Sequence, residues 1–173
     1  MQRKREKFHV PQLASNKMEK MVGVIGAHEC ASDLYELAYE VGYGVAQHGL
    51  TLVCGGLGGV MTAACQGAKA AGGRTVGILP SAQVDTANAW VDVAIATGMG
   101  EARNGIIVHS AQVLIAIAGG YGTLAEIALA LRAQKPIVGL HSWKFTPPRE
   151  VQVAMPTVTT AAEAVAWAIA HLQ

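Results

Sequence analysis

The chain has 173 residues, of which 51% are hydrophobic and 14% are charged, and its formal net charge is +1. This high apolar content excludes an intrinsically disordered chain, and the balanced charge lacks the broad basic footprint of a nucleic-acid-binding protein. Because the N-terminus shows no signal peptide and the chain has no run of about 18 apolar residues, we expect a cytoplasmic protein that does not span a membrane.

The predicted elements begin after a polar N-terminal stretch. Residues 1–20 show no sustained hydrophobic period, so we expect a disordered tail, with residues 21–173 forming a single domain. The apolar run 21–26 predicts a buried strand, and Ser32 or Asp33 is suited to cap a helix that Gly49 closes. The same patterns predict strands at 50–54, 75–79, 90–97, 113–118, 137–140 and 151–155, and helices at 60–71, 101–109, 124–133 and 160–172.

Strand, glycine turn and helix follow one another several times along the chain. Alternation of this kind indicates βαβ units, and therefore a parallel sheet with helices on both faces. The strands are nearly continuous apolar runs, as strands covered on both sides require. We therefore predict an α/β fold with a Rossmann-like doubly wound, mostly parallel sheet, whose ligand lies beyond the carboxyl ends of the strands.

Glycine-rich segments fall at this edge of the predicted sheet, at residues 23–26, 55–59 and 119–123. Glycine lets backbone N–H groups approach a phosphate closely, and the helix that follows adds the positive end of its dipole. None of the segments is a Walker loop or a G-x-G-x-x-G fingerprint. Thr123 can donate its hydroxyl to a phosphate, but Thr123 and Glu126 are also spaced as a capping box, and both interpretations stay open here.

The residues outside these loops carry few further chemical signals. Cys30, Cys54 and Cys65 form no C-x-x-C pair, so we expect free thiols in a reducing compartment. No set of His, Asp and Glu has the spacing of metal ligands, so we predict no metal held by the protein itself. The high apolar content favours a homo-oligomer, either a dimer or a tetramer.

The segment Gly119-Gly120-Tyr121-Gly122-Thr123-Leu124-Ala125-Glu126 resembles the GGxGTxxE motif of the LONELY GUY family. Members of that family are cytokinin-activating phosphoribohydrolases, which split a nucleoside 5′-monophosphate into a base and ribose 5-phosphate on a Rossmann-like, usually dimeric fold. The family usually has proline at the position of Ala118. It also has an Arg-Lys pair upstream, of which Arg103 is present, whereas Asn104 replaces the lysine and removes a positive charge.

The chain as a whole is more similar to a sister group of the same SLOG/LONELY GUY-like superfamily, which includes the molybdenum cofactor carrier proteins. The similarity runs from about residue 21 to residue 143 and includes the segments 55–61, 67–73, 75–80, 98–104 and 125–131. Those carriers are homo-oligomers that hold a pterin monophosphate with its metal. The resemblance therefore implies a small phosphate-bearing ligand, either the molybdenum cofactor or a nucleoside monophosphate.

Roles for individual residues follow from the glycine loops and from this resemblance. The residues expected to contact the ligand are Gly26, Gly55, Gly56, Gly58, Gly59, Met61, Arg103, Asn104, Gly119, Gly120, Gly122, Thr123 and Glu126. If the protein is an enzyme, Glu126 and Arg103 are the catalytic candidates, because a carboxylate stabilises the positive charge that N-glycosidic cleavage builds on the ribose. Three hypotheses follow: a carrier or storage protein, a phosphoribohydrolase, and a nucleotide-sensing module.

Overall fold

The computed structural model describes residues 18–149 and 155–172, so most of the expected tail and of the expected strand at 151–155 lies outside it. The strands are β1 Met21–Gly26, β2 Thr51–Cys54, β3 Thr75–Leu79, β4 Val93–Ala96, β5 Val113–Ile117, β6 Ile137–Leu140 and β7 Thr157–Val158. The helices are α1 Ser32–Gln47, α2 Val60–Ala70, α3 Asn104–Ser110, α4 Tyr121–Arg132 and α5 Ala161–Ala170, with short 3-10 turns η1 Val84–Thr86 and η2 Gly100–Arg103. Within these ranges, no helix is both long and apolar enough to cross a membrane.

The strands form one sheet of seven, in the order β4-β3-β2-β1-β5-β6-β7, and every neighbouring pair is parallel. This arrangement confirms the predicted doubly wound α/β fold. The chain winds outward from β1 to β4 on one side and then returns to place β5 against β1. The strand order therefore reverses between β1 and β5, and a crevice is expected beyond the carboxyl ends of these two strands.

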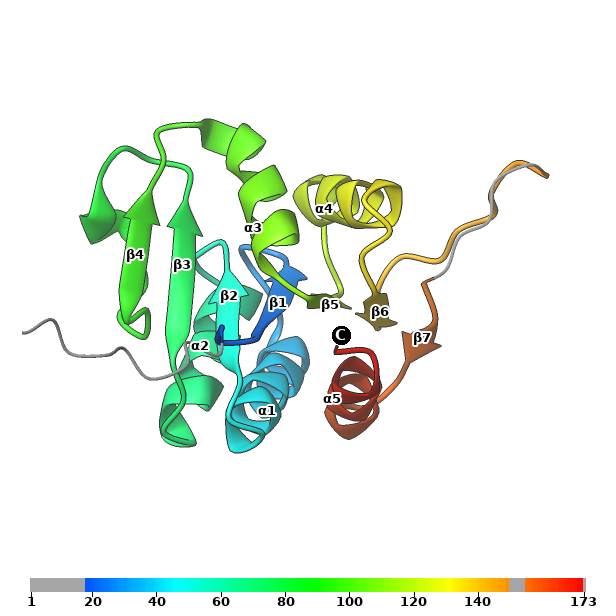
Figure 1. The fold of residues 1–173 in the computed structure, drawn as a ribbon, viewed down its shortest axis with the longest axis horizontal. Helices are drawn as coiled ribbons and strands as arrows, with labels where there is room; N and C mark the ends of the chain where they lie inside the picture. Colours follow the sequence, from blue (N-terminus) through cyan, green and yellow to red (C-terminus); the bar gives the residue numbers. More distant parts are fainter. Residues whose placement is uncertain (1–17, 150–154, 173) are drawn as a thin grey trace, which may run out of the picture.

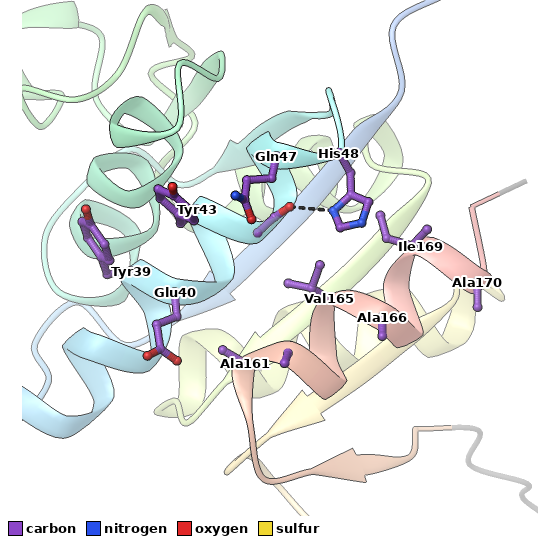
Figure 2. A pocket seen from close by; sticks show the side chains of 12 residues that line it. Tyr39, Glu40, Tyr43, Gln47, His48, Ala161, Val165, Ala166, Ile169 and Ala170 are labelled. Atoms are coloured by element: carbon purple, nitrogen blue, oxygen red, sulfur yellow. Dashed lines mark hydrogen bonds between the residues drawn. The ribbon is translucent and has the colours of Figure 1, made fainter.

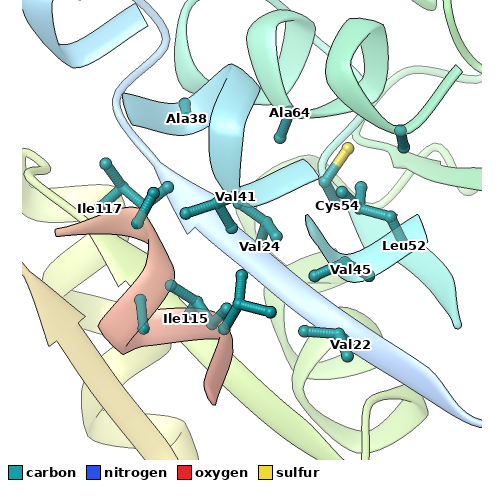
Figure 3. Close-up of a cluster of buried hydrophobic side chains, with 14 of the residues drawn as sticks. Val22, Val24, Ala38, Val41, Val45, Leu52, Cys54, Ala64, Ile115 and Ile117 are labelled. Carbon is teal, nitrogen blue, oxygen red and sulfur yellow. The ribbon is translucent and has the colours of Figure 1, made fainter. Parts of the chain in front are cut away.

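Helices cover both faces of the sheet, with α1, α2 and α5 on one face and α3 and α4 on the other (Figure 1). Each face has its own apolar core. Figure 3 shows the first core, where Val41 and Val45 of α1 meet Val24 of β1 and Ile115 of β5. The second core lies between the sheet and the helices α3 and α4, and it includes Ile107 and Ile127, which are both fully buried.

Helices α1 and α2 pack with their backbones in contact. A Cβ atom added at Gly42 in α1 would meet the carbonyl oxygen of Ala64 at 1.9 Å, and one added at Gly67 in α2 would meet that of Tyr39 at 1.9 Å. No side chain fits in either gap. The two glycines therefore let α1 and α2 approach more closely than side-chain packing normally allows.

Several element boundaries differ from the sequence expectation for identifiable reasons. Strand β4 starts at Val93 rather than at residue 90, because the preceding residues form a turn in which the Val91 N–H donates to the Asn88 carbonyl at 3.2 Å. The helix expected at 101–109 is divided into η2 and α3. Neither expected capping residue caps α1, since the N-cap position is Ala31 and no side chain bonds to the first turn.

Candidate ligand-binding cleft

A cleft of about 410 Å³ lies where the fold predicts it, beyond the carboxyl ends of β1 and β5. A volume of this size is typical of sites for small molecules. Of the residues expected to contact the ligand, those that line the cleft are Gly26, Gly55, Met61, Arg103, Asn104, Gly120, Gly122, Thr123 and Glu126. Gly56, Gly58, Gly59 and Gly119 belong to the same loops but do not line it.

The N-terminus of α4 supplies unpaired backbone donors to this cleft. The helix starts at Tyr121 with Gly120 as its N-cap, and Leu124 is its first residue whose N–H finds a carbonyl, that of Gly120 at 3.0 Å. Within the described residues, the N–H groups of Tyr121, Gly122 and Thr123 have no acceptor. Such a helix start favours an anion, because orphan N–H groups and the helix dipole act together.

The capping-box interpretation of Thr123 and Glu126 is wrong, because both residues lie inside α4 and no side chain caps this helix. The helix begins earlier than predicted, within the glycine motif itself. A capping box does occur elsewhere: the Thr160 hydroxyl accepts the Glu163 N–H at 3.2 Å, and the Glu163 carboxylate accepts the Thr160 N–H at 3.1 Å. The Thr123 side chain is thus left for the cleft.

The turn between β5 and α4 has a demanding backbone. Gly119 has a φ of +114°, and a Cβ added there would lie 2.4 Å from the Thr123 Cβ, so this position requires glycine. Ala118 has a φ of +48°. Proline holds φ near −65°, so the proline that the LONELY GUY family usually has at this position does not fit the backbone seen here.

The loop at 55–59 forms a wall of the cleft, and two of its five N–H groups, those of Gly56 and Gly58, are engaged within the protein. The Gly56 N–H points to the Cys54 sulfur at 3.3 Å, and the Gly58 N–H donates to His28 Nδ1 at 3.3 Å. The N–H of Val60, which opens α2, donates to the Ala27 carbonyl at 3.0 Å. At the start of α4, by contrast, three consecutive N–H groups have no acceptor among the described residues.

A buried ion pair lies on the floor of the cleft. Arg103 Nη1 is 3.8 Å from Glu126 Oε1, and the two side chains are only 10% and 8% exposed. Burial raises the pKa of Glu126 to about 7, although the neighbouring Arg103 opposes this shift. Burial also lowers the pKa of Arg103, an effect that the Glu126 charge opposes.

Arg103 is held tightly but is not fully satisfied. Its Nη1 donates to Asn104 Oδ1, and its Nη2 lies so close to Gly55 that an added Cβ would approach it to 2.6 Å. Its Nε is buried without a hydrogen-bond partner among the described residues. An orphaned donor of a buried guanidinium costs free energy, and an anion in the cleft would reduce that cost.

Six of the lining residues were not expected from the sequence, namely Ile25, Ala27, Leu57, Pro80, Gly100 and Glu101. All of them lie at or just after the carboxyl end of a strand, and this position is the signal that would have identified them. Four of them, Ile25, Ala27, Leu57 and Pro80, have apolar side chains, so the cleft has apolar surface as well as polar groups. His28, which follows β1, also lines the cleft.

A second, larger hollow of about 760 Å³ lies between α1 and α5, on the helical face rather than at the strand ends. Figure 2 shows Tyr39 and Tyr43 of α1 on one side of it, and Val165 and Ile169 of α5 on the other. None of the predicted site residues lines it. Because its polar groups do not converge, it has the character of a helix–helix groove rather than a phosphate site.

Among the described residues, no group of three or more His, Cys, Asp or Glu side chains could hold a metal ion.

Known proteins share this fold. The molybdenum cofactor binding protein from Rippkaea orientalis has a TM-score of 0.71 at 44% identity, covering 74% of this chain and 79% of its own. The carrier protein for the same cofactor from Chlamydomonas reinhardtii has a TM-score of 0.75 at 38% identity, covering 90% of this chain and 98% of its own.

A relative named for catalysis is also similar in sequence. The cytokinin riboside 5′-monophosphate phosphoribohydrolase of Mycobacterium tuberculosis is 38% identical over 122 residues, which are 65% of this chain and 65% of that protein. The family model described as the SLOG cluster4 family matches residues 19–169. The match spans nearly all of the residues that the structure describes, and the chain therefore belongs to the SLOG cluster4 family.

Proposed function

We propose that this protein binds a small phosphate-bearing, nucleotide-like ligand in the cleft and serves as a carrier or storage protein for the molybdenum cofactor. The observation that carries the proposal is the N-terminus of α4, where three consecutive N–H groups lack an acceptor within the described residues, and two of them belong to Gly122 and Thr123, which line the cleft. These donors suit a terminal phosphate, because they cost no reorganisation when the anion arrives.

The rest of the cleft fits a flat heterocycle joined to that phosphate. Leu57, Met61 and Pro80 give apolar surface on which a ring can lie, while Arg103 offers a cation with an unpartnered Nε. The neighbours from Rippkaea orientalis and Chlamydomonas reinhardtii are named for binding or carrying the molybdenum cofactor, and they favour this ligand over other nucleotide-like molecules. In this proposal the metal arrives as part of the cargo.

A direct test is to purify the protein from a bacterial host that makes the molybdenum cofactor and to measure the fluorescent pterin released by acid oxidation. We expect close to one pterin per chain, and none from a host that cannot make pterins. A Thr123→Val variant removes one hydroxyl from the phosphate site with little change in shape, and we expect it to lower pterin retention about tenfold. Thr157→Val, at an exposed position of the edge strand β7, is the matched control.

A second candidate function is hydrolysis of a nucleoside 5′-monophosphate, and the Arg103–Glu126 pair favours it. A carboxylate at the floor of the cleft could stabilise positive charge on a ribose or orient an attacking water, while Arg103 neutralises the phosphate. The relative from Mycobacterium tuberculosis is named for this activity. Asn104 stands where the LONELY GUY family has lysine, so the pair lacks the family's second cation.

Release of free base from AMP separates the two functions. A carrier binds AMP or the pterin without releasing base, whereas a phosphoribohydrolase releases adenine in a reaction that Glu126→Gln abolishes. The third hypothesis, a nucleotide-sensing module, predicts binding without turnover and a protein partner that is captured only in the presence of the ligand. The expected homo-oligomer is checked on the same sample by sedimentation, where a dimer or tetramer is the predicted species.

A further inference from the structure

His28 lies two residues after the end of β1 and lines the cleft, and its ring is oriented by the neighbouring loop. Its Nδ1 is 3.3 Å from the Gly58 backbone nitrogen. A backbone N–H only donates, so Nδ1 must accept this bond. The neutral ring therefore carries its proton on Nε2, which makes Nε2 a hydrogen-bond donor.

The contact that holds this ring depends on two glycines. A Cβ added at Gly58 would lie 2.9 Å from the His28 carbonyl oxygen and 3.2 Å from its Cε1, and one added at Gly59 would lie 2.4 Å from the same oxygen. The Val60 N–H, which donates to the Ala27 carbonyl at 3.0 Å, adds a second link between the two loops. The loop after β1 and the loop after β2 are thus joined at the His28 backbone, and the Gly58 N–H orients the exposed His28 ring.

The donor at His28 Nε2 has no partner among the described residues, and the side chain is exposed at the cleft. It lies on the β2 side of the cleft, whereas the orphan N–H groups of α4 lie on the β5 side. If the phosphate of the ligand occupies the α4 end, the far end of the ligand faces the β2 side. A purine or a pterin presents ring nitrogens and carbonyl oxygens there as acceptors.

We propose that His28 is a specificity-determining residue that donates its Nε2–H to an acceptor on the heterocycle of the bound ligand. This inference rests on the proposed function, since it assumes that a heterocyclic monophosphate binds in the cleft. The hydrogen bond from the Gly58 N–H to His28 Nδ1 positions the ring, because it favours the tautomer with the proton on Nε2 and orients that N–H toward the cleft. His28 then contributes to recognition of the ring, while α4 and Arg103 recognise the phosphate.

Calorimetric titrations with AMP, GMP and ribose 5-phosphate test this assignment on wild type and three variants. Ribose 5-phosphate carries the phosphate without a base. His28→Ala is expected to weaken binding of AMP or GMP about tenfold, with ribose 5-phosphate unchanged. His28→Gln places an amide donor near the Nε2 position and should restore most of the loss, whereas His28→Asn places its amide near Nδ1 and should not.

Two results would overturn the proposal. Rescue by His28→Asn and not by His28→Gln would show that the side chain serves only to brace Gly58. An equal loss for the nucleotides and for ribose 5-phosphate would show that His28 acts on the phosphate site or on the loops. Failure of the proposed function looks different, because wild type itself would then bind neither the nucleotides nor ribose 5-phosphate. Thermal unfolding of each variant confirms that the comparison is made on folded protein.

Discussion

Arg103 Nη1 lies 3.8 Å from Glu126 Oε1, and both side chains are almost entirely withdrawn from solvent. The two residues come from different segments, η2 and α4, that the fold brings together beyond the strand ends. Removing two charges from water costs more than their attraction returns when the geometry is imperfect. The raised pKa of Glu126, about 7, is the consequence of this imbalance, since burial outweighs the arginine.

Replacing Glu126 by Gln should therefore make the protein less sensitive to pH. With a folded pKa of about 7 against an ordinary 4.5, the folded state binds more protons than the unfolded state between these values. The stability contributed by protonated Glu126 is full below pH 4.5 and is lost as pH rises through 7. We expect the unfolding free energy of wild type, relative to Glu126→Gln, to fall by on the order of 3 kcal/mol over that range.

Urea denaturation at several pH values measures this difference. Glu40→Gln, at an exposed position of α1, is the control and should follow wild type at every pH. A difference between wild type and Glu126→Gln that stays constant from pH 4.5 to 8 would contradict the raised pKa.

The positive φ of Ala118 predicts that proline is not tolerated at this position. Ala118→Pro cannot adopt the observed φ of +48° and also loses the N–H that donates to the Leu140 carbonyl at 3.0 Å. We expect it to destabilise the fold by about 2 kcal/mol or more, measured by urea denaturation. Ala118→Gly is the matched change, and it should stay within about 1 kcal/mol of wild type because relief of strain offsets added chain freedom. A proline variant as stable as wild type would show that this turn has another backbone.

The contact between α1 and α2 predicts an unusually costly Gly→Ala change. Gly42→Ala would place a methyl group 1.9 Å from the Ala64 carbonyl oxygen, and the helices must separate to admit it. We expect a loss of about 2–3 kcal/mol and a clear drop in the melting temperature. Gly105→Ala in α3 has nothing within 4 Å and should instead stabilise the protein by about 0.5–1 kcal/mol, as alanine usually does inside a helix.

The cysteines should differ in reactivity. Cys54 and Cys65 are fully buried with their sulfur atoms 3.5 Å apart, whereas Cys30 is half-buried and burial raises its pKa. A thiol reagent should label one cysteine of the native protein, slowly, and all three in denaturant. Cys30→Ser should abolish labelling of the native protein. Fast labelling of Cys54 or Cys65 without denaturant would show that the core beneath the loop at 55–59 opens readily.

Much of the fold could be predicted because its strands are unbroken apolar runs with clear ends. The expected bounds of β1, β3 and β6 agree with the structure, since each run ends at glycine, at proline or at a change to polar residues. The sequence predicts that α4 begins at Leu124, three residues later than it does in the structure, because glycines normally indicate a loop. In the structure Gly120 is the N-cap and Gly122 is part of the first helical turn. The local sequence does not show where the loop ends and the helix begins.

Many of the residues of the candidate site could be predicted from the sequence. Which of their backbone N–H groups are free to bind a ligand could not be predicted. Loops at strand ends meet at one edge of a parallel sheet, so the glycine segments and Glu126 could be assigned to that edge from their order. Arg103 is a candidate only through the resemblance to the LONELY GUY family. Which N–H groups remain free depends on partners far along the chain. The N–H of Gly58 is used by His28, thirty residues earlier. No local pattern in the sequence carries that information.

If the cleft binds a phosphate as proposed, the raised pKa of Glu126 in α4 also couples ligand binding to pH. A phosphate dianion arriving at the unpaired N–H groups brings negative charge close to Glu126, and like charge disfavours its ionised form. Ligand binding near neutral pH should therefore be accompanied by proton uptake at Glu126, and ligand release should release the proton. Because the coupling between proton binding and ligand binding is reciprocal, the affinity for the ligand should rise as the pH falls and decrease as the pH rises. A protein that only holds and hands over its ligand would thus exchange protons with every transfer.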